Sequence, residues 1–270
     1  MKKSKRVKKT SFTKKLLEGK EKSTIIVYLT LRLLVIVCMV AQAMHKNWEN
    51  VFLCILTLIM FTVPTLIERK LKIDFPSVLE IIVYIFIYSA AILGEIQNFY
   101  GIFKTWDTML HTLNGFLCAA VGFSLIDIIN REERFNIKLS PLFLSLVAFC
   151  FSMTVGVMWE FFEFTADRYF LFDMQKDRIV DVVSSVELNE ENENKTIIID
   201  DIEKTIIYTK DNEQIVIEDG YLELGLIDTM KDLFVNFIGA AVFSIFGYLY
   251  VINREKYKGL EKIIPRVKRD

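Results

Sequence analysis

Apolar residues in this chain gather in six long runs separated by polar segments. The runs cover residues 25–44, 51–67, 78–99, 107–128, 141–164 and 226–252. Most of them reach the roughly 20 residues that an α-helix needs to cross the hydrocarbon core of a bilayer. The second run is the shortest, and it contains Pro64. The pattern predicts an all-α polytopic membrane protein, a bundle of six transmembrane helices.

The long polar segment between the fifth and sixth runs follows a different period. After Asp173 and the stretch VELNEENENK, apolar and polar residues alternate over 196–199, 205–209 and 215–218. A period of two residues is typical of β-strands, and the polar residues between these segments supply turns. We expect a small antiparallel β-meander on the outer face. It fits two interpretations, a surface insertion and a lid over a site.

These patterns divide the chain into five predicted segments. They are a basic arm (1–24), transmembrane helices one to five (25–172), a β-rich insertion (173–225), transmembrane helix six (226–252) and a basic tail (253–270).

Lysine and arginine predict the orientation, because they are concentrated in cytoplasmic segments of membrane proteins. The arm up to Lys22 holds ten of them, the tail holds seven, and the loops after runs two and four hold three each. The opposite short loops hold one each, Lys46 and Lys104. We therefore expect a multi-pass protein of the cell membrane with both termini cytoplasmic and the insertion outside. Ala41-Gln42-Ala43 also resembles a signal-peptide cleavage site, but five further runs still indicate an integral membrane protein.

The composition supports this class of protein. The 270 residues are 53% hydrophobic, which is too apolar for a soluble domain of this size, and the net charge is −1. The four cysteines stand in four different apolar runs, which indicates packing residues rather than disulfides or a metal motif. Since the basic arm adjoins the first run, its expected partners are anionic membrane lipids and not nucleic acid.

Polar and ionisable residues of four runs fall at the outer ends of the predicted helices. They are Glu95, Asp107, His111, Glu160, Glu163, Asp228, Asp232 and Asn236. Most have spacings of three or four residues within their run, which places them on one helix face. Charged groups inside membrane helices are costly, so they usually face a cavity or one another.

A divalent cation would relieve the repulsion between these carboxylates. Oxygen ligands with one imidazole suit Mg²⁺, Mn²⁺, Zn²⁺ or Fe²⁺, and the pattern leaves these open. The predicted roles are metal ligation by Asp107, His111, Glu160 and Asp232, orientation of a ligand by Asn236, and general-base catalysis by Glu163 or Asp228.

Other interpretations stay open at this point. Asp107 and Asp228 open their helices, where a carboxylate also serves as an N-cap or a first-turn group. Glu95 and Glu163 also fit positions at the water interface. The whole set fits an interhelical hydrogen-bond network that only holds the bundle together.

Three motifs carry a resemblance to a known family. WDTMLHTLNG, VGVMWEFFEF and GLIDTMKDLFVNFIGA closely resemble the YjdF-like family of bacterial inner-membrane proteins, over about residues 31–250. The order D-xxx-H, E-xx-E, D-xxx-N-xx-G more distantly resembles the VanZ-like family. The matching positions are Asp107, His111, Glu160, Asp232, Asn236 and Gly239. Glu163 departs, standing where that family has Gln. The VanZ likeness implies an envelope function and lowered susceptibility to glycopeptide antibiotics, without an established reaction.

The leading functional hypothesis is a metal-dependent hydrolase or transferase acting on a lipid-linked or envelope substrate. The sequence shows no nucleophilic serine motif and no phosphate-binding loop, which favours chemistry through an activated water. The alternatives are a cation-coupled transporter and a structural or partner-binding membrane protein. An internal repeat, which many transporters contain, is not seen.

Overall fold

The computed structural model describes residues 20–71, 73–131, 138–190, 194–264 and 266–267. Most of the predicted basic arm and the last residues of the basic tail lie outside the described residues. Six helices in the described part are long and apolar enough to cross a membrane. These are Lys22–Met44, Trp48–Lys70, Ser77–Ile96, Trp106–Asn130, Pro141–Phe170 and Leu226–Ile252. The predicted six-helix membrane fold is confirmed.

Two of the six spans depart from a regular α-helix. The second consists of α3 (Trp48–Met60) and α4 (Val63–Leu71), with a turn between them. Pro64 stands in the first turn of α4, where its missing N–H breaks no helical hydrogen bond. The third begins as α5 (Ser77–Tyr88) and continues as a π-helix, η1 (Ser89–Ile96).

The chain forms two compact units. The first unit comprises residues 1–155 and 235–270, and the second unit comprises residues 156–234. Helices α8 (Pro141–Phe170) and α9 (Leu226–Ile252) each contribute residues to both units.

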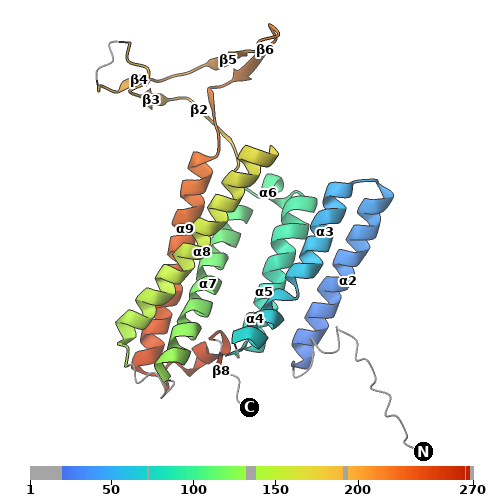
Figure 1. The fold of residues 1–270 in the computed structure, drawn as a ribbon, viewed down its shortest axis with the longest axis vertical. Helices are drawn as coiled ribbons and strands as arrows, with labels where there is room; N and C mark the ends of the chain where they lie inside the picture. Colours follow the sequence, from blue (N-terminus) through green and yellow to red (C-terminus); the bar gives the residue numbers. More distant parts are fainter. Residues whose placement is uncertain (1–19, 72, 132–137, 191–193, 265, 268–270) are drawn as a thin grey trace, which may run out of the picture. The chain divides into compact units, whose positions relative to one another are not determined.

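The first unit contains a cluster in which α2 (Lys22–Met44), α3 and α5 lie side by side (Figure 1). Three buried aromatic rings meet at its centre, with ring centroids 5.2 Å apart for Tyr28 and Tyr84 and 5.8 Å for Phe61 and Tyr84. Aromatic pairs at this separation stabilise a core beyond the area that they bury.

Helix α7 (Trp106–Arg131) packs with the parts of α8 and α9 that belong to the first unit. Alanines and phenylalanines of these helices fill that core, among them Ala119, Phe123 and Phe243. In contrast, large apolar side chains such as Leu33, Phe52 and Ile245 are exposed. An apolar exterior on helices of spanning length is the surface that a lipid bilayer covers.

Two glycines let α7 and α9 come into backbone contact. A Cβ atom at Gly239 would lie 2.0 Å from the carbonyl oxygen of Thr112, and one at Gly115 would lie 2.1 Å from that of Asn236. Ser152 on α8 donates a hydrogen bond of 2.7 Å to the carbonyl of Gly115. Small residues at such crossings are how membrane helices approach closely without a hydrophobic driving force.

Short elements link the remaining helices of the first unit. Helix α6 (Phe99–Ile102) precedes α7, and the 3₁₀-helix η3 (Lys258–Lys262) follows α9. Strands β1 (Ile73–Asp74) and β8 (Arg266–Val267) pair in antiparallel fashion.

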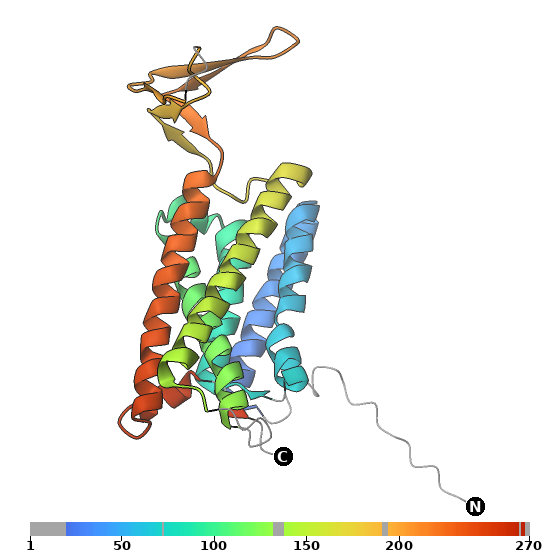
Figure 2. The same cartoon turned by 60° about the vertical axis from the view of Figure 1, so that its left-hand side comes forward.

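The second unit carries the predicted β-rich insertion. Its strands are β2 (Arg178–Val180), β3 (Val183–Ser185), β4 (Ile197–Ile199), β5 (Lys204–Tyr208), β6 (Gln214–Glu218) and β7 (Tyr221–Glu223). They form three antiparallel pairs, β2 with β7, β3 with β4, and β5 with β6. The hairpin β5–β6, orange in Figure 2, is the longest. Antiparallel strands are confirmed, but they form three separate pairs and not one continuous meander, because the first strand of the insertion pairs with the last.

Candidate functional site

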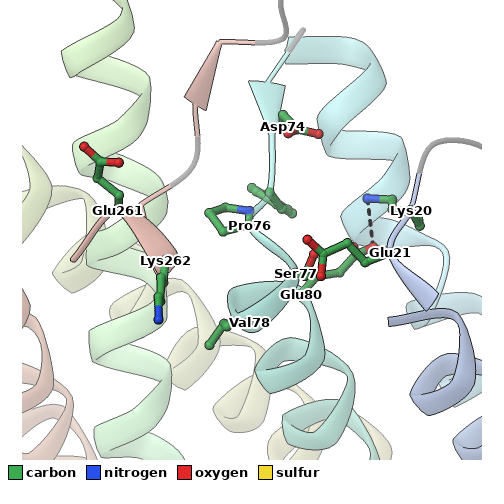
Figure 3. A pocket seen from close by; sticks show the side chains of 10 residues that line it. Lys20, Glu21, Asp74, Pro76, Ser77, Val78, Glu80, Glu261 and Lys262 are labelled. Carbon is green, nitrogen blue, oxygen red and sulfur yellow. Dashed lines mark ion pairs between the residues drawn. The ribbon is translucent and has the colours of Figure 1, made fainter. Parts of the chain in front are cut away.

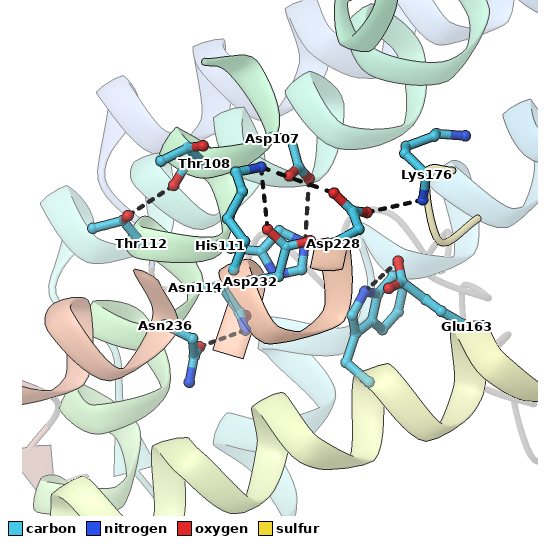
Figure 4. A network of polar contacts seen from close by, with 12 residues as sticks. Asp107, Thr108, His111, Thr112, Asn114, Glu163, Lys176, Asp228, Asp232 and Asn236 are labelled. Atoms are coloured by element: carbon cyan, nitrogen blue, oxygen red, sulfur yellow. Dashed lines mark hydrogen bonds and ion pairs between the residues drawn. The ribbon is translucent and has the colours of Figure 1, made fainter. Parts of the chain in front are cut away.

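The first turns of α7 present a stripe of polar side chains (Figure 4). Asp107, His111 and Asn114 follow one another at spacings of four and three residues, so they share one helix face. His111 Nε2 lies 3.4 Å from Asp107 Oδ1, and both side chains are largely buried. The rings of Phe99 and Trp106, with centroids 4.9 Å apart, pack at the start of the helix. This ring contact holds the N-terminal end of α7 in place, where the stripe begins.

The last residue of the stripe, Asn114, contacts α9. Asn114 Nδ2 donates to Asn236 Oδ1 at 3.3 Å, and Asn236 Nδ2 lies 3.6 Å from the sulfur of Met153 on α8. The Asn236 side chain is only 1% exposed. A buried amide needs partners of this kind, so Asn236 joins three helices of the first unit.

In the second unit, the first turns of α9 carry a cluster of charges. Lys231 Nζ lies 3.9 Å from Asp228 Oδ1 and 3.6 Å from Asp232 Oδ1. Arg178 Nη2 lies 3.9 Å from Asp228 Oδ1, and the backbone N–H of Lys176 donates to Asp228 Oδ2 at 2.9 Å. Both aspartates are buried, and these cations offset part of the cost of burying their charges.

Asp228 does not act as the N-cap of α9. The carboxylate of Glu223 accepts the first N–H groups of the helix, from Leu226 at 2.7 Å and from Ile227 at 3.2 Å. Asp228 stands in the first turn, where its negative charge is favoured by the helix dipole.

The two glutamates of α8 share a buried face in the second unit. Glu160 and Glu163 are 5% and 8% exposed, whereas Phe161 and Phe162 between them are more than half exposed. Trp159 Nε1 donates to Glu163 Oε1 at 2.9 Å. The three-residue spacing thus turns both carboxylates away from the exposed aromatic face.

The junction between α8 and the insertion contains polar contacts that the sequence patterns do not indicate. Asp167 accepts backbone N–H groups from Met174 at 2.7 Å and from Gln175 at 2.8 Å. The Gln175 side chain donates to Thr229 on α9 at 2.5 Å. These residues form no motif in the sequence, since their partners lie 7 to 54 positions away.

Acidic groups crowd the base of the insertion. Partial desolvation raises the pKa of the Asp177 carboxyl above its ordinary value, and the nearby carboxylates of Asp173, Glu223 and Asp167 raise it further. The folded state therefore opposes ionisation of Asp177. The stability that its neutral form provides is lost as the pH rises through this raised pKa.

We accordingly expect Asp177→Asn to raise the thermal midpoint of the protein slightly at pH 7. The difference in thermal midpoint should vanish below the unfolded-state pKa of about 4, where the aspartic acid of the wild type is as neutral as the asparagine of the variant. Thermal unfolding of both proteins at a series of pH values measures this. A lower midpoint for the variant at pH 7 would contradict the expectation.

The structure therefore places the predicted site residues in groups. In the first unit it brings Asp107 to His111 and joins Asn236 to Asn114. In the second unit Asp228 and Asp232 flank Lys231, and Glu160 lies with Glu163 on one face of α8. Glu95 lies in the π-helix η1. Sequence reasoning missed Asn114, although its spacing from Asp107 and His111 continues their helical stripe.

Comparisons with known proteins bear on the family. A family model described as "Predicted membrane protein (DUF2238)" matches residues 26–190. The chain belongs to this family. The DUF2238 match covers more than half of the chain and includes Asp107, His111, Glu160 and Glu163, while the cluster on α9 lies beyond it.

One relative comes from Thermotoga maritima and is described as "Uncharacterized protein". It is 25% identical over 105 residues, which are 39% of this chain and 52% of the relative. The chain thus matches about half the length of that relative. No solved structure matches. The more distant likeness to the VanZ-like family stays a prediction from the motifs.

Proposed function

We propose that this integral membrane protein binds a divalent cation through polar residues at the outer ends of its helices and acts on a lipid-linked or envelope substrate. The reaction would be a hydrolysis or a group transfer. The proposed location is the cell membrane, with both termini in the cytoplasm and the insertion outside. The concentration of lysine and arginine in the arm, the tail and two loops supports this orientation.

The observation that carries the proposal is the pair of Asp107 and His111 on α7. An imidazole nitrogen 3.4 Å from a carboxylate, both largely buried in a helix of spanning length, is a costly arrangement that a functional site explains. The Asn114–Asn236 hydrogen bond marks where α7 and α9 meet. His111 precedes Asn114 by three residues and Asp232 precedes Asn236 by four, so each lies about one turn before that contact on its own helix.

The chemistry of these side chains fits a metal ion. Asp107, His111 and Asp232 can each offer one ligand atom to a metal. Two carboxylates and one imidazole suit Mn²⁺, Zn²⁺ or Fe²⁺, and a third carboxylate, Glu160, would complete the proposed ligand set. When bound, such a cation would lower the pKa of a coordinated water toward neutrality.

The remaining residues have separate proposed roles. Glu163 accepts a hydrogen bond from Trp159 through Oε1, which orients its carboxylate to take a proton from the attacking water. Asp228, which a backbone N–H, Arg178 and Lys231 contact, is the other proposed candidate for the general base. Asn236 would orient a ligand through the amide that it presents beside Asn114.

A structural role is the second candidate, and one observation favours it. Lys231 lies between Asp228 and Asp232, so an ammonium group already compensates part of the negative charge that a metal would neutralise. In that case the polar residues would hold the helices together without a cofactor.

Metal analysis separates the two candidates. The purified protein in detergent should contain about one equivalent of a divalent metal, and His111→Ala and Asp232→Asn should each lose it, because each removes a ligand. Asp127→Asn is the matched control, since Asp127 is also buried in a spanning helix but pairs with Arg254 at 3.1 Å. Elemental analysis and thermal unfolding are measured on all four proteins.

The outcomes point in opposite directions. Metal lost in both site variants and kept in the control supports the cation site. Absent or unchanged metal, together with a lower thermal midpoint in the site variants, supports the structural role. Lipid profiling of a deletion strain and of a strain producing His111→Ala then tests the enzyme. An envelope lipid that accumulates in both strains is the expected result, and unchanged lipid profiles would favour a cation-coupled transporter.

A further inference from the structure

A polar pocket lies in the first unit, and the residues that line it are separate from those of the candidate site. It has a volume of about 510 Å³ and is lined by residues 20–21, 74–78, 80 and 261–262 (Figure 3). Residues 20–21 directly precede α2, residues 74–76 lead into α5, and residues 261–262 follow α9. Residues 261–262 belong to η3, and the predicted topology puts all three segments on the same side of the membrane. This is the layer in which lipid headgroups lie.

One lining residue of the pocket, Glu80, is a buried carboxylate with no hydrogen-bond donor on one oxygen among the described residues. Glu80 is 1% exposed. Its Oε1 accepts a hydrogen bond from Tyr84 Oη at 2.7 Å and lies 3.0 Å from Lys20 Nζ. Its Oε2 has no hydrogen-bond partner among the described residues. A buried acceptor without a donor is costly, so the pocket calls for a group that donates hydrogen bonds.

The carboxylates at this place already hold one ammonium group. Lys20 Nζ lies 2.5 Å from Glu68 Oε2 as well as 3.0 Å from Glu80 Oε1. Two buried carboxylates around one ammonium leave a net negative charge, which favours a second cation. Glu21, Asp74 and Glu261 add carboxylates around the pocket.

The same pocket also offers positive potential. Lys262 lines it, and so does the first turn of α5, a helix of 12 residues whose N-cap, Pro76, makes no side-chain capping hydrogen bond. Uncapped N–H groups at a helix N-terminus bind phosphate oxygens. A ligand for this pocket thus carries an ammonium and a phosphate. A single metal ion would match neither the volume nor the mixed charge.

We propose that this pocket binds the headgroup of an aminophospholipid of the phosphatidylethanolamine type. The ammonium group donates to Glu80 Oε2 and to the neighbouring carboxylates, while the phosphate lies by Lys262 and the first turn of α5. The acyl chains would extend along the membrane beside Val78, which lines the pocket and is 44% exposed. This binding is independent of the cation site and of any reaction there.

The test compares lipids that differ in the N–H donors and in the charge of their headgroups. Native mass spectrometry of the full-length protein in detergent, titrated with phosphatidylethanolamine, phosphatidylcholine or phosphatidylglycerol of matched chains, gives an affinity for each. Phosphatidylcholine has the same charges but no N–H group, so phosphatidylethanolamine should bind at least about tenfold more tightly. Soluble phosphoethanolamine is added as a competitor. If phosphoethanolamine displaces phosphatidylethanolamine, the headgroup alone is sufficient for binding. If it does not, the acyl chains are also required for binding.

Variants locate the binding. Glu80→Gln should abolish the preference over phosphatidylcholine, whereas Asp127→Asn, a buried carboxylate outside the pocket, should keep it. If Glu80→Gln fails to fold by circular dichroism, Lys262→Ala takes its place and should weaken the binding of both zwitterionic lipids. Equal affinity of the wild-type protein for phosphatidylethanolamine and phosphatidylcholine, or tighter binding of phosphatidylglycerol, overturns the proposal.

Discussion

Gly239→Ala is expected to destabilise the protein by about 3 kcal/mol, the upper part of the range for overpacked cores. The new Cβ would lie 2.0 Å from the carbonyl oxygen of Thr112 and 2.9 Å from the backbone nitrogen of Phe116. Neither atom belongs to a side chain that could rotate away, so α7 and α9 must move apart. That movement would also weaken the Asn114–Asn236 hydrogen bond.

Helix propensity alone predicts the opposite sign, because alanine is a better helix former than glycine by about 1 kcal/mol. Gly259→Ala is therefore a useful control, since a Cβ there meets nothing within 4 Å. Gly122→Ala should give an intermediate loss, because the atoms nearest to its Cβ belong to the Phe151 side chain, 2.7 Å away, and not to the backbone. Unfolding in detergent, monitored by circular dichroism, ranks the three variants by stability. Equal stability of Gly239→Ala and Gly259→Ala would show that the close approach of α7 and α9 contributes nothing.

The sequence was sufficient for the helical part of the fold, because a run of about 20 apolar residues has few alternatives in a membrane. Irregularities were harder to predict. The turn between α3 and α4 in the second span was not predicted, and nothing local indicates that residues 89–96 form a π-helix. Helix α8 continues to Phe170, beyond the apolar run that ends at residue 164, because the polar side chains of its last turns tolerate a water interface.

In the insertion, local sequence patterns predict some strands but not the pairing of distant ones. Strands β4, β5 and β6 follow from alternation over 196–199, 205–209 and 215–218. Strands β2 and β7 do not, because their pairing joins Arg178 to Glu223, across nearly the whole insertion. Register between distant segments is set by closure of the chain, which composition and periodicity do not encode.

For the candidate site, helical spacing predicted which side chains share a face. Asp107 and His111 do so on α7, and Glu160 and Glu163 do so on α8. Spacing could not reveal partners on other segments. The hydrogen bond from the backbone N–H of Lys176 to Asp228, 52 positions away in the sequence, is the clearest case.

Lys20→Met should also cost about 3 kcal/mol, for an electrostatic reason. The Lys20 side chain is 11% exposed and separates two carboxylates that are themselves 8% and 1% exposed. Removing one partner of a buried ion pair leaves an uncompensated buried charge, which typically costs 3–5 kcal/mol. Here two negative charges would face each other without the ammonium between them. Lys22→Met is the matched control, because Lys22 is exposed and only two residues away.

The double variant Lys20→Met/Glu80→Gln distinguishes lost charge compensation from lost packing. Glutamine keeps an acceptor for Tyr84 and removes one of the two charges, so the double variant should be more stable than Lys20→Met alone. Glu68 retains the backbone N–H of Phe75 at 2.8 Å, which holds that carboxylate in place in both proteins. Free energies of unfolding for the wild type, both single variants and the double variant give the coupling energy. Strictly additive losses would mean that Lys20 stabilises the protein through its aliphatic stem and not through its charge.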